Sequence, residues 1–216
     1  MSLTQSIQDQ TQTRQALLEA AAEVFARVGY RAATVREICI NAAANIAAVN
    51  YHFGDKANLY REVFRYTHRE AQSQFPAHLA ESAEASPEAR LRSFIEAMVQ
   101  RIFADGVVAW HGRLMSREMI EPSEALDEIV EEGIRPQTEV LSAIMRDLIG
   151  AEAAQEEVRF FCCSVVSQCL FYHHCRPVLE RLFPGSFEGT AQVDRLVNHI
   201  TEFSLAAIRQ KAGNQV

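Results

Sequence analysis

The sequence predicts an all-α protein, and three observations lead to this fold class. Glycine and proline, which interrupt helices, number only 9 and 6 among 216 residues. No segment of strand length alternates apolar and polar residues between turn signals. Apolar residues instead recur at the three- and four-residue spacing of amphipathic helices, and residues typical of helix caps bound these patterns. A chain of this length is expected to bury a sizeable core in one or two domains.

The charge balance and the N-terminus narrow the possible classes of protein. The net charge of −7 disfavours a surface that binds polyanions through bulk positive charge. The only lysines are Lys56 and Lys211, so any DNA contact would depend on neutral donors and helix N-termini. No apolar stretch reaches the length of a membrane span, and the N-terminus lacks the apolar core of a secretory signal. We therefore expect a cytoplasmic protein without a membrane partner, with its cysteines reduced.

The first part of the chain predicts a tail and then a helix. Residues 1–13 are rich in Thr, Gln and Ser, which indicates a disordered tail. From Arg14 to Gly29, apolar residues follow one helical face, and Gly29 suits the left-handed position that ends many helices. This helix is expected to pack against the two short helices that follow it. The core candidates of this three-helix unit are Phe25, Val28, Val35, Ile38, Val49 and Phe53.

Residues 34–56 predict two short helices joined by a tight turn. Thr34 and Glu37 have the spacing of a capping box, in which the hydroxyl accepts from the Glu37 N–H and the carboxylate reaches back. Asn45 can cap the second helix, and Asp55 can cap the helix after it. Apart from its two core candidates, the second helix carries small or polar side chains. This pattern suits a helix-turn-helix whose second helix enters the DNA major groove, and it suits an ordinary corner between two helices equally well.

The order of motifs in this region carries a family resemblance. An amphipathic helix ending in Gly-Tyr is followed by TVREI and then by A-x-x-N-x-A-x-x-N-Y-H-F-x-x-K-x-x-L-Y. In this register, residues 14–66 resemble the N-terminal domain of TetR/AcrR-family transcriptional regulators. The resemblance implies that one set of side chains holds DNA phosphates and that the early positions of the second short helix face the bases. The implied phosphate contacts are Thr34, Tyr51, His52 and Lys56, and the implied base-facing residues are Asn45, Ile46, Ala47, Ala48 and Asn50.

Two positions depart from the family pattern. The turn position often filled by glycine is Ala43, and the tyrosine that frequently precedes the aromatic-histidine pair is Asn50. An asparagine can pair with adenine N6 and N7, while the methyl groups of Ile46 or an alanine can meet a thymine methyl. The alternative for Asn50 is a contact with phosphate or water.

The following helix, over residues 56–80, is expected to leave the DNA-binding domain of residues 14–60. It would enter a ligand-binding and dimerisation domain of residues 61–216, and the resemblance implies that it transmits the ligand state. Ser86 and Pro87 predict the start of the next helix, and Ser123 caps a later one. Pro136 is expected to bend or interrupt that later helix because it lacks an N–H. The run RLMSREMIEPSEALDEIVEEGIRP resembles the C-terminal domain of the CecR-like subgroup.

Two long helices, over residues 153–183 and 187–211, are expected to end the chain. The first is apolar nearly all round and the second has a regular apolar stripe. Both features suit a four-helix interface between two subunits, and the resemblance implies the same homodimer. The alternative is that both helices serve only the core of one subunit.

No constellation for catalysis or for a metal ion stands out. The five cysteines form no CxxC pair, and adjacent His173 and His174 point about 100° apart on a helix. The sequence has no HExxH, GxGxxG or phosphate-binding loop. We therefore expect no cofactor, no metal site and no catalytic residues. The acidic side chains of Asp127, Glu128, Glu131 and Glu132 are expected to form a solvated face.

A small-molecule effector is expected to bind inside the C-terminal bundle, in an apolar site with a few polar anchors. The candidate lining residues are Phe103, Trp110, His111, Met115, Met119, Tyr172 and His173. Together these features predict a ligand-responsive transcriptional regulator, a repressor that binds a palindromic double-stranded operator as a dimer. The alternatives are a regulator that senses a metal or oxidant through Cys and His, a small helical enzyme, and a helical scaffold.

Overall fold

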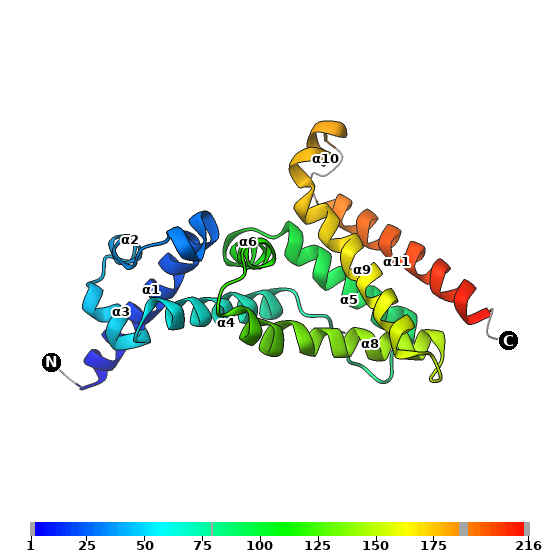
Figure 1. The fold of residues 1–216 in the computed structure, drawn as a ribbon, viewed down its shortest axis with the longest axis horizontal. Coiled ribbons are helices and arrows are strands. Elements are labelled where there is room, and N and C mark those ends of the chain that lie inside the picture. The colour runs from blue at the N-terminus through cyan, green and yellow to red at the C-terminus, as the bar shows by residue number, and fades with distance from the viewer. Residues whose placement is uncertain (1–2, 79, 186–189, 214–216) are drawn as a thin grey trace. The chain divides into compact units, whose positions relative to one another are not determined.

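The computed structural model describes residues 3–78, 80–185 and 190–213, and in these ranges the regular structure is helical (Figure 1). The helices form two compact units. Unit 1 takes its helices from the chain up to Ser73 and from Asp105–Gly133, and unit 2 from Gln74–Ala104 and from Ile134 onward. The DNA-binding domain expected over residues 14–60 therefore lies in unit 1, which also includes most of the next helix and a later segment.

Unit 1 begins with α1 (Leu3–Ala32), followed by α2 (Val35–Asn41) and α3 (Ile46–Phe53). The helix extends through residues 3–13, for which the sequence predicted disorder. Gly29 has a φ of 81°, which breaks the helical geometry near the end of α1 where the sequence placed a C-terminal glycine. Four of the six core candidates are buried, while Val28 and Val35 are half-buried.

The turn between α2 and α3 contains one strained residue. Ala43 has a φ of 49°, in the left-handed region where a Cβ is unfavourable and glycine is preferred. The Ala43 N–H donates to the Ile40 carbonyl at 3.1 Å, and the Ala44 N–H donates to the Cys39 carbonyl at 2.9 Å. Ala43, which stands where the family often has glycine, therefore lies at a position where the backbone adopts a positive φ.

The rest of unit 1 is α4 (Lys56–Gln74), α6 (Gly106–Ile120), α7 (Leu126–Ile129) and the π-helix η1 (Val130–Ile134), whose last residue already belongs to unit 2. Asp55 caps α4 through a hydrogen bond from the Asn58 N–H at 2.8 Å. Ser123 Oγ accepts from the Ala125 N–H at 3.2 Å, so it stabilises the turn before α7.

The proline expected to interrupt the later helix acts differently. α8 (Arg135–Ile149) follows η1 without an intervening loop, and Pro136 lies in its first turn. Because Pro136 has no N–H, the Glu132 carbonyl cannot receive the bond that an α-helix would give it. A wider π-turn at this point is the physical outcome, where the sequence left open a bend or an interruption.

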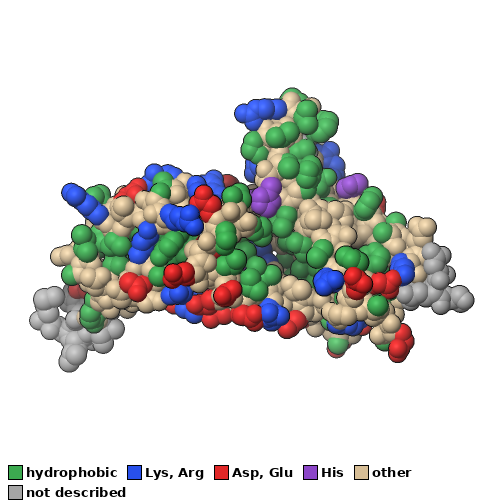
Figure 2. Space-filling model, in the orientation of Figure 1, with side chains coloured by type: hydrophobic (Ala, Val, Ile, Leu, Met, Phe, Trp, Pro, Cys, Tyr) green, Lys and Arg blue, Asp and Glu red, His purple; other side chains and the backbone are tan. Residues whose placement is uncertain are grey.

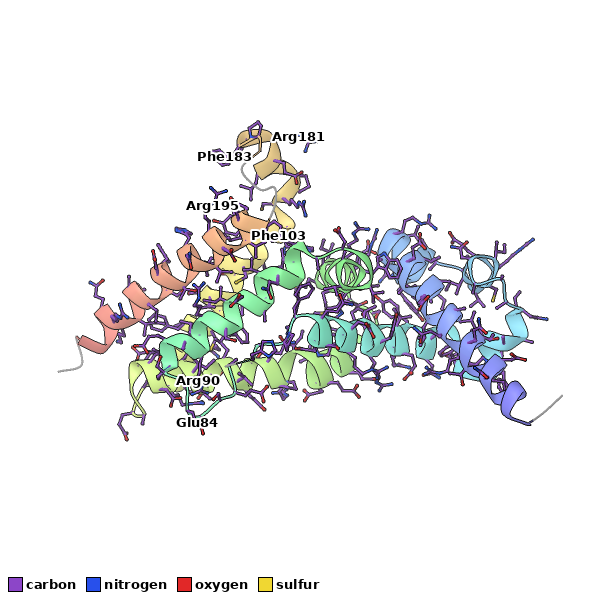
Figure 3. All side chains as sticks on the ribbon, turned by 180° about the vertical axis from the view of Figure 1, so that it is seen from behind. Glu84, Arg90, Phe103, Arg181, Phe183 and Arg195 are labelled. Atoms are coloured by element: carbon purple, nitrogen blue, oxygen red, sulfur yellow. The ribbon has the colours of Figure 1, made fainter. Side chains whose placement is uncertain are left out.

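Unit 2 contains α5 (Pro87–Phe103), α8, α9 (Gln155–His174), α10 (Arg176–Leu182) and α11 (Thr190–Gly213). Ser86 caps α5 with Pro87 in the first turn, as predicted. α5, α8, α9 and α11 pack together around one apolar cluster that includes Leu91, Ile144 and Ile200. Arg90 (labelled in Figure 3) pairs with Asp147 and donates to the Ala80 carbonyl, which ties α5 to α8.

The single helix predicted for residues 153–183 is wrong. The chain breaks at Cys175 into α9 and α10, because Pro177 follows and cannot continue the hydrogen-bond ladder of α9. α10 packs on α9 through Leu179 and exposes Val178, Leu182 and Phe183. Figure 2 shows apolar side chains gathered on this helix, and Figure 3 shows Phe183 at its far end.

Candidate nucleic-acid interface

Two buried side chains fix α3 on unit 1. Val49 is fully buried and Phe53 is 6% exposed, and they lie four residues apart on one face as predicted. The Oδ1 atom of Asn45 caps the helix by accepting from the Ala47 N–H at 2.9 Å. Gly54 ends it with a φ of 81°. This leaves one face of a short, firmly held helix turned to solvent.

The nine residues predicted to contact DNA are accessible to solvent. Tyr51 is 71% exposed and Ile46 is 50% exposed. The other exposed members are Thr34, Asn45, Ala47 and Asn50, and the half-buried ones are Ala48, His52 and Lys56. The outer face of α3 therefore carries no acidic or basic residue apart from His52 near its C-terminal end.

Thr34 and Asn45 already use their side-chain oxygens as caps. Thr34 Oγ1 accepts from the Glu37 N–H at 3.2 Å. The second hydrogen bond of the predicted capping box would run from the Thr34 N–H to the Glu37 carboxylate. That carboxylate pairs with Arg27 instead. For Asn45, the capping bond leaves only the side-chain NH₂ group to act as a donor to DNA. Both residues thus hold the N-termini of α2 and α3 in place, and the helix dipole gives each N-terminus a partial positive charge that favours an anion nearby.

Lys56 rests on the C-terminal end of α1, beyond Gly29. Its Nζ atom lies 4.6 Å from the centre of the Tyr30 ring and donates to the Arg31 carbonyl at 3.4 Å. Burial lowers the pKa of Lys56 from its ordinary value, because desolvation disfavours the charged form. Lys56 could reach a phosphate in two ways. Its side chain could turn away from Tyr30, or it could bind the phosphate from its present position against the Tyr30 ring.

Two other cations of unit 1 are already paired. Arg14 binds Glu62, and Arg27 binds Glu37. Arg36 is exposed on the first turn of α2, and none of the ion pairs among the described residues involves it. Arg36 is the arginine of the TVREI motif beside Thr34 and is absent from the residues predicted to contact DNA. It is the missed residue whose charge and position best suit a phosphate.

A buried polar contact supports the C-terminal end of α1 from behind. Tyr60 and Glu118 are 1% and 2% exposed, and the Tyr60 hydroxyl donates to Glu118 at 2.7 Å. Burial, followed by the hydrogen bond to Glu118, raises the pKa of Tyr60. The second carboxylate oxygen of Glu118 accepts from the Ser123 N–H at 3.0 Å. Tyr60 stacks on Tyr30 with ring centres 4.8 Å apart, so the contact extends to the aromatic ring below Lys56.

The residue next to Glu118 clamps the end of α1. The Arg117 guanidinium donates to the Ala26 carbonyl at 3.2 Å and to the Arg27 carbonyl at 2.6 Å. These carbonyls belong to the last turn of α1, where a cation is favoured by the helix dipole. A cavity of about 330 Å³ opens beside this clamp and is lined in part by Tyr30, Arg117 and Glu118.

The residues predicted to bind an effector divide between the two units. Trp110, His111, Met115 and Met119 lie on α6 in unit 1, and Phe103, Tyr172 and His173 lie on α5 and α9 in unit 2. His111 Nδ1 forms a 3.0 Å hydrogen bond with Thr67, whereas Met119 is 53% exposed. The Arg176 guanidinium lies 5.5 Å from the centre of the Phe103 ring.

One polar group of unit 2 was not selected from the sequence. Arg101 of α5 donates from Nε and Nη2 to the Phe75 carbonyl, at 3.2 and 2.8 Å, and from Nη1 to Gln137 at 3.3 Å. Burial lowers its pKa to about 10. The one signal in the sequence is that Arg101 lies two residues before Phe103, a predicted effector-binding residue, on the same helix.

The thiols give little support to oxidant sensing. Burial raises the pKa of Cys39 and of Cys162, and it raises that of Cys169 to about 12. A reactive thiol needs a lowered pKa and access to solvent. Across the described residues, no group of three or more His, Cys, Asp or Glu side chains is placed to hold a metal ion. No described helix is long and apolar enough to cross a membrane.

Family models match both parts of the chain. Residues 17–63 match the model of bacterial regulatory proteins of the tetR family. Residues 87–208 match the model of the C-terminal domain of the HTH-type transcriptional dual regulator CecR.

Individual proteins agree with these models. The dual regulator CecR of Shigella flexneri is 30% identical over 151 residues, which cover 66% of this chain and 67% of that protein. The transcriptional repressor AcnR of Corynebacterium glutamicum is 42% identical over 55 residues, covering 26% of this chain and 29% of that protein. The crystal structure of HlyIIR, a hemolysin II transcriptional regulator, shares the fold with a TM-score of 0.63 at 24% identity, over 89% of this chain and 98% of that one.

The exposed face of α3, the capped N-termini beside it and these matches lead to one conclusion. The chain belongs to the TetR family of bacterial DNA-binding transcriptional regulators, and its C-terminal domain is of the CecR type.

Proposed function

We propose that this protein is a cytoplasmic repressor that binds a palindromic operator as a homodimer and leaves it when a small effector binds unit 2. The observation that carries the proposal is the outer face of α3, which is exposed and nearly uncharged on a helix held by two buried side chains. Such a face reads base edges through amide and methyl groups, since charge alone gives no sequence information. Asn50 is the side chain best placed for a bidentate contact with adenine.

The outer faces of α9 and α11 support the dimer. These two helices lie side by side in unit 2 (Figure 1), and each exposes aromatic residues. Phe160 and Phe171 of α9 are 59% and 51% exposed, and Phe203 of α11 is 61% exposed. Between the two aromatic residues of α9, the exposed positions are Cys163, Ser164 and Ser167, which carry no charge. An uncharged face with exposed aromatic side chains is typical of the core of a subunit interface.

The dimer can be tested by sedimentation. Phe203→Glu should shift the protein from dimer to monomer, because it places a charge on the expected interface. Ile120→Glu is the matched control, since Ile120 is an exposed apolar residue on α6 in unit 1. Equal association of both variants and the wild type would exclude this interface.

The effector site is proposed in unit 2, from the three predicted residues that lie there, Phe103, Tyr172 and His173, with Arg101 as an additional polar anchor. Aromatic side chains suit an apolar ligand, and a few polar groups would fix its orientation. Compounds that release the protein from DNA would be tested against Tyr172→Ala and Phe103→Ala. Loss of release with unchanged DNA affinity would support the assignment, and an unchanged dose response in both variants would contradict it.

The main experiment is selection of bound DNA from a random pool by the full-length protein. We expect a palindrome with half-sites about one helical turn apart, roughly 34–36 Å. Asn50→Ala should then relax the preference at one base position, while Lys56→Ala should weaken binding to all sequences alike and lower the salt dependence. Equal loss of affinity for operator and random DNA in Asn50→Ala would contradict base reading by this residue.

A further inference from the structure

The two units are joined by three covalent connections, and two of them are helical. The chain passes between the units at Ser73–Gln74, Ala104–Asp105 and Gly133–Ile134. α4 runs through the first connection and η1 runs through the third. The packing of α4 against η1 within unit 1 therefore sets the position and the direction in which two of the three connections leave unit 1.

Arg65 of α4 binds both helices that lead to the third connection. Its Nε atom lies 2.8 Å from Oε2 of Glu132, and its Nη2 atom lies 3.0 Å from Oε1 of the same residue. Nη2 also pairs with Glu128 of α7, and Nη1 donates to Glu62 of α4 at 2.8 Å. A guanidinium that uses its whole fork on three carboxylates fixes both distance and orientation, which a single point charge would not.

The contacts of Arg65 correct the expectation for the acidic face. Glu128 and Glu132, predicted to be solvated, bind α4 instead, and Arg61 adds a 3.2 Å contact to Glu128. One turn further along α4, His68 lies against Gly133, where a Cβ would come within 3.9 Å of the imidazole ring. The contact between α4 and the α7–η1 segment thus continues to the last residue of unit 1.

The same ion pairs reach the recognition helix. Glu62 holds Arg14 of α1, and the Arg14 guanidinium lies 5.2 Å from the centre of the Phe53 ring at the end of α3. A contiguous set of contacts therefore runs from α3 through α1 and α4 to η1. The π-turn at the far end is a place where a helix can change register by one residue, because its hydrogen bonds are already wider than those of an α-helix.

We propose that Arg65 is a positioning residue for operator binding, which braces α4 against α7–η1 and so sets the separation at which a dimer presents its two α3 helices. This inference rests on the proposed function, because it assumes a dimer on a two-part operator. Arg65 contacts no DNA in this role. It restricts the set of half-site spacings that the dimer accepts, because a loosened brace allows the recognition helices to reach more than one separation.

The test uses the full-length protein and the operator selected by the wild type. Variants of that operator, lengthened or shortened by one base pair between the half-sites, are titrated with Arg65→Gln and Glu132→Gln. Arg69→Gln is the matched control, since Arg69 is an exposed arginine of the same helix and none of the ion pairs among the described residues involves it. Wild type and control should discriminate strongly against altered spacing. Arg65→Gln should reduce that discrimination by about fivefold, a typical coupling between sites.

A second measurement does not depend on DNA. Amide hydrogen exchange over residues 130–134 should be faster in Arg65→Gln than in Arg69→Gln, because the brace no longer holds the π-turn. Glu132→Gln should give the same changes with less risk of unfolding, since the Glu132 side chain is 52% exposed. The double variant Arg65→Gln/Glu132→Gln should be no worse than Arg65→Gln alone, as expected for residues that act through one contact.

The outcomes separate this inference from the proposed function. Wild-type protein that selects no DNA sequence would overturn both. Selection of a palindrome, followed by equal loss of affinity at every spacing in Arg65→Gln and by unchanged exchange at residues 130–134, would overturn the positioning role alone. Altered spacing preference in Arg69→Gln to the same extent would also overturn it, because the effect would then follow charge and not the brace.

Discussion

Units 1 and 2 both have an apolar core, but charged groups contribute more of the contacts between helices in unit 1. In unit 2, α5, α8, α9 and α11 share one apolar cluster, and the buried polar residues among those described are the neutral Thr201 and Ser204. In unit 1, α6 and α7–η1 are attached through charged groups: the buried Glu118, the clamp at Arg117 and the ion pairs of Arg65. Unit 2 also contains the Arg90–Asp147 pair, but unit 1 should respond more strongly than unit 2 to pH, salt and single charge changes.

The largest effect is expected in the apolar cluster. Ile144→Ala should lower the free energy of unfolding by about 2–5 kcal/mol, because it removes buried methyl groups and leaves a cavity. The loss should be the same at low and high salt when unfolding is followed with denaturant. A loss that changes strongly with salt concentration would mean that charged groups also hold unit 2.

The next largest effect on stability is expected from a substitution that removes the buried Tyr60–Glu118 contact of unit 1. Glu118→Ala leaves the Tyr60 hydroxyl and the Ser123 N–H without their acceptor, so stability should fall by about 2–3 kcal/mol. Glu118→Gln is the control, since its amide oxygen can still accept one of these bonds and the loss should be smaller. Thermal unfolding of the two variants would compare them, and equal losses would show that the hydrogen bonds contribute little.

A smaller effect concerns the backbone. Among the described residues, Ala43 of unit 1 is the non-glycine residue with a positive φ. Ala43→Gly should raise the free energy of unfolding by about 1 kcal/mol, because glycine adopts the left-handed region without steric cost. Operator affinity should stay unchanged, as the substitution preserves the turn. Lower stability of this variant would mean that the methyl group contributes more through packing than the strain costs.

The smallest effect is a pH dependence. The hydrogen bond from Arg65 lowers the pKa of Glu132 below its ordinary value of 4.5. A carboxylate whose pKa is lowered by folding contributes stability above its unfolded pKa, and this contribution disappears as the pH falls through the folded value. The difference in Tm between wild type and Glu132→Gln should therefore be present at neutral pH and disappear as the pH falls below 4.5 through the lowered pKa of Glu132. A difference that persists at low pH would point to packing as its cause.

The same contrast explains what the sequence could predict. Thr34, Asn45, Asp55 and Ser86 were identified as caps because a capping bond spans only two or three residues. The inward face of α3 followed from local spacing as well. These local signals, with the resemblance to a family, were sufficient for the helical fold and for the exposed residues of α3.

The contacts of unit 1 over longer intervals were not predictable in this way. The residues next to Glu132 in the sequence predict an acid exposed to solvent. Its partner Arg65 lies 67 positions away in the chain. The local sequence does not indicate that Glu118 of α6 is buried, because its partner Tyr60 lies on another helix. The apolar pattern continues across Cys175, so periodicity alone does not locate the break that Pro177 imposes there. The pairing of charges across helices depends on packing angles, which periodicity does not contain.

The pairing of Arg14, Arg27, Arg61 and Arg65 with carboxylates also bears on how the protein is distributed in a cell. Non-specific affinity for DNA comes almost entirely from cations that displace counterions, and a genome offers a very large excess of non-operator sites. Internal pairing of these four arginines lowers the positive charge available to non-operator DNA, so the protein should spend less of its time on those sites. A small number of copies should then suffice to keep an operator occupied, and a modest effector concentration should suffice to clear it.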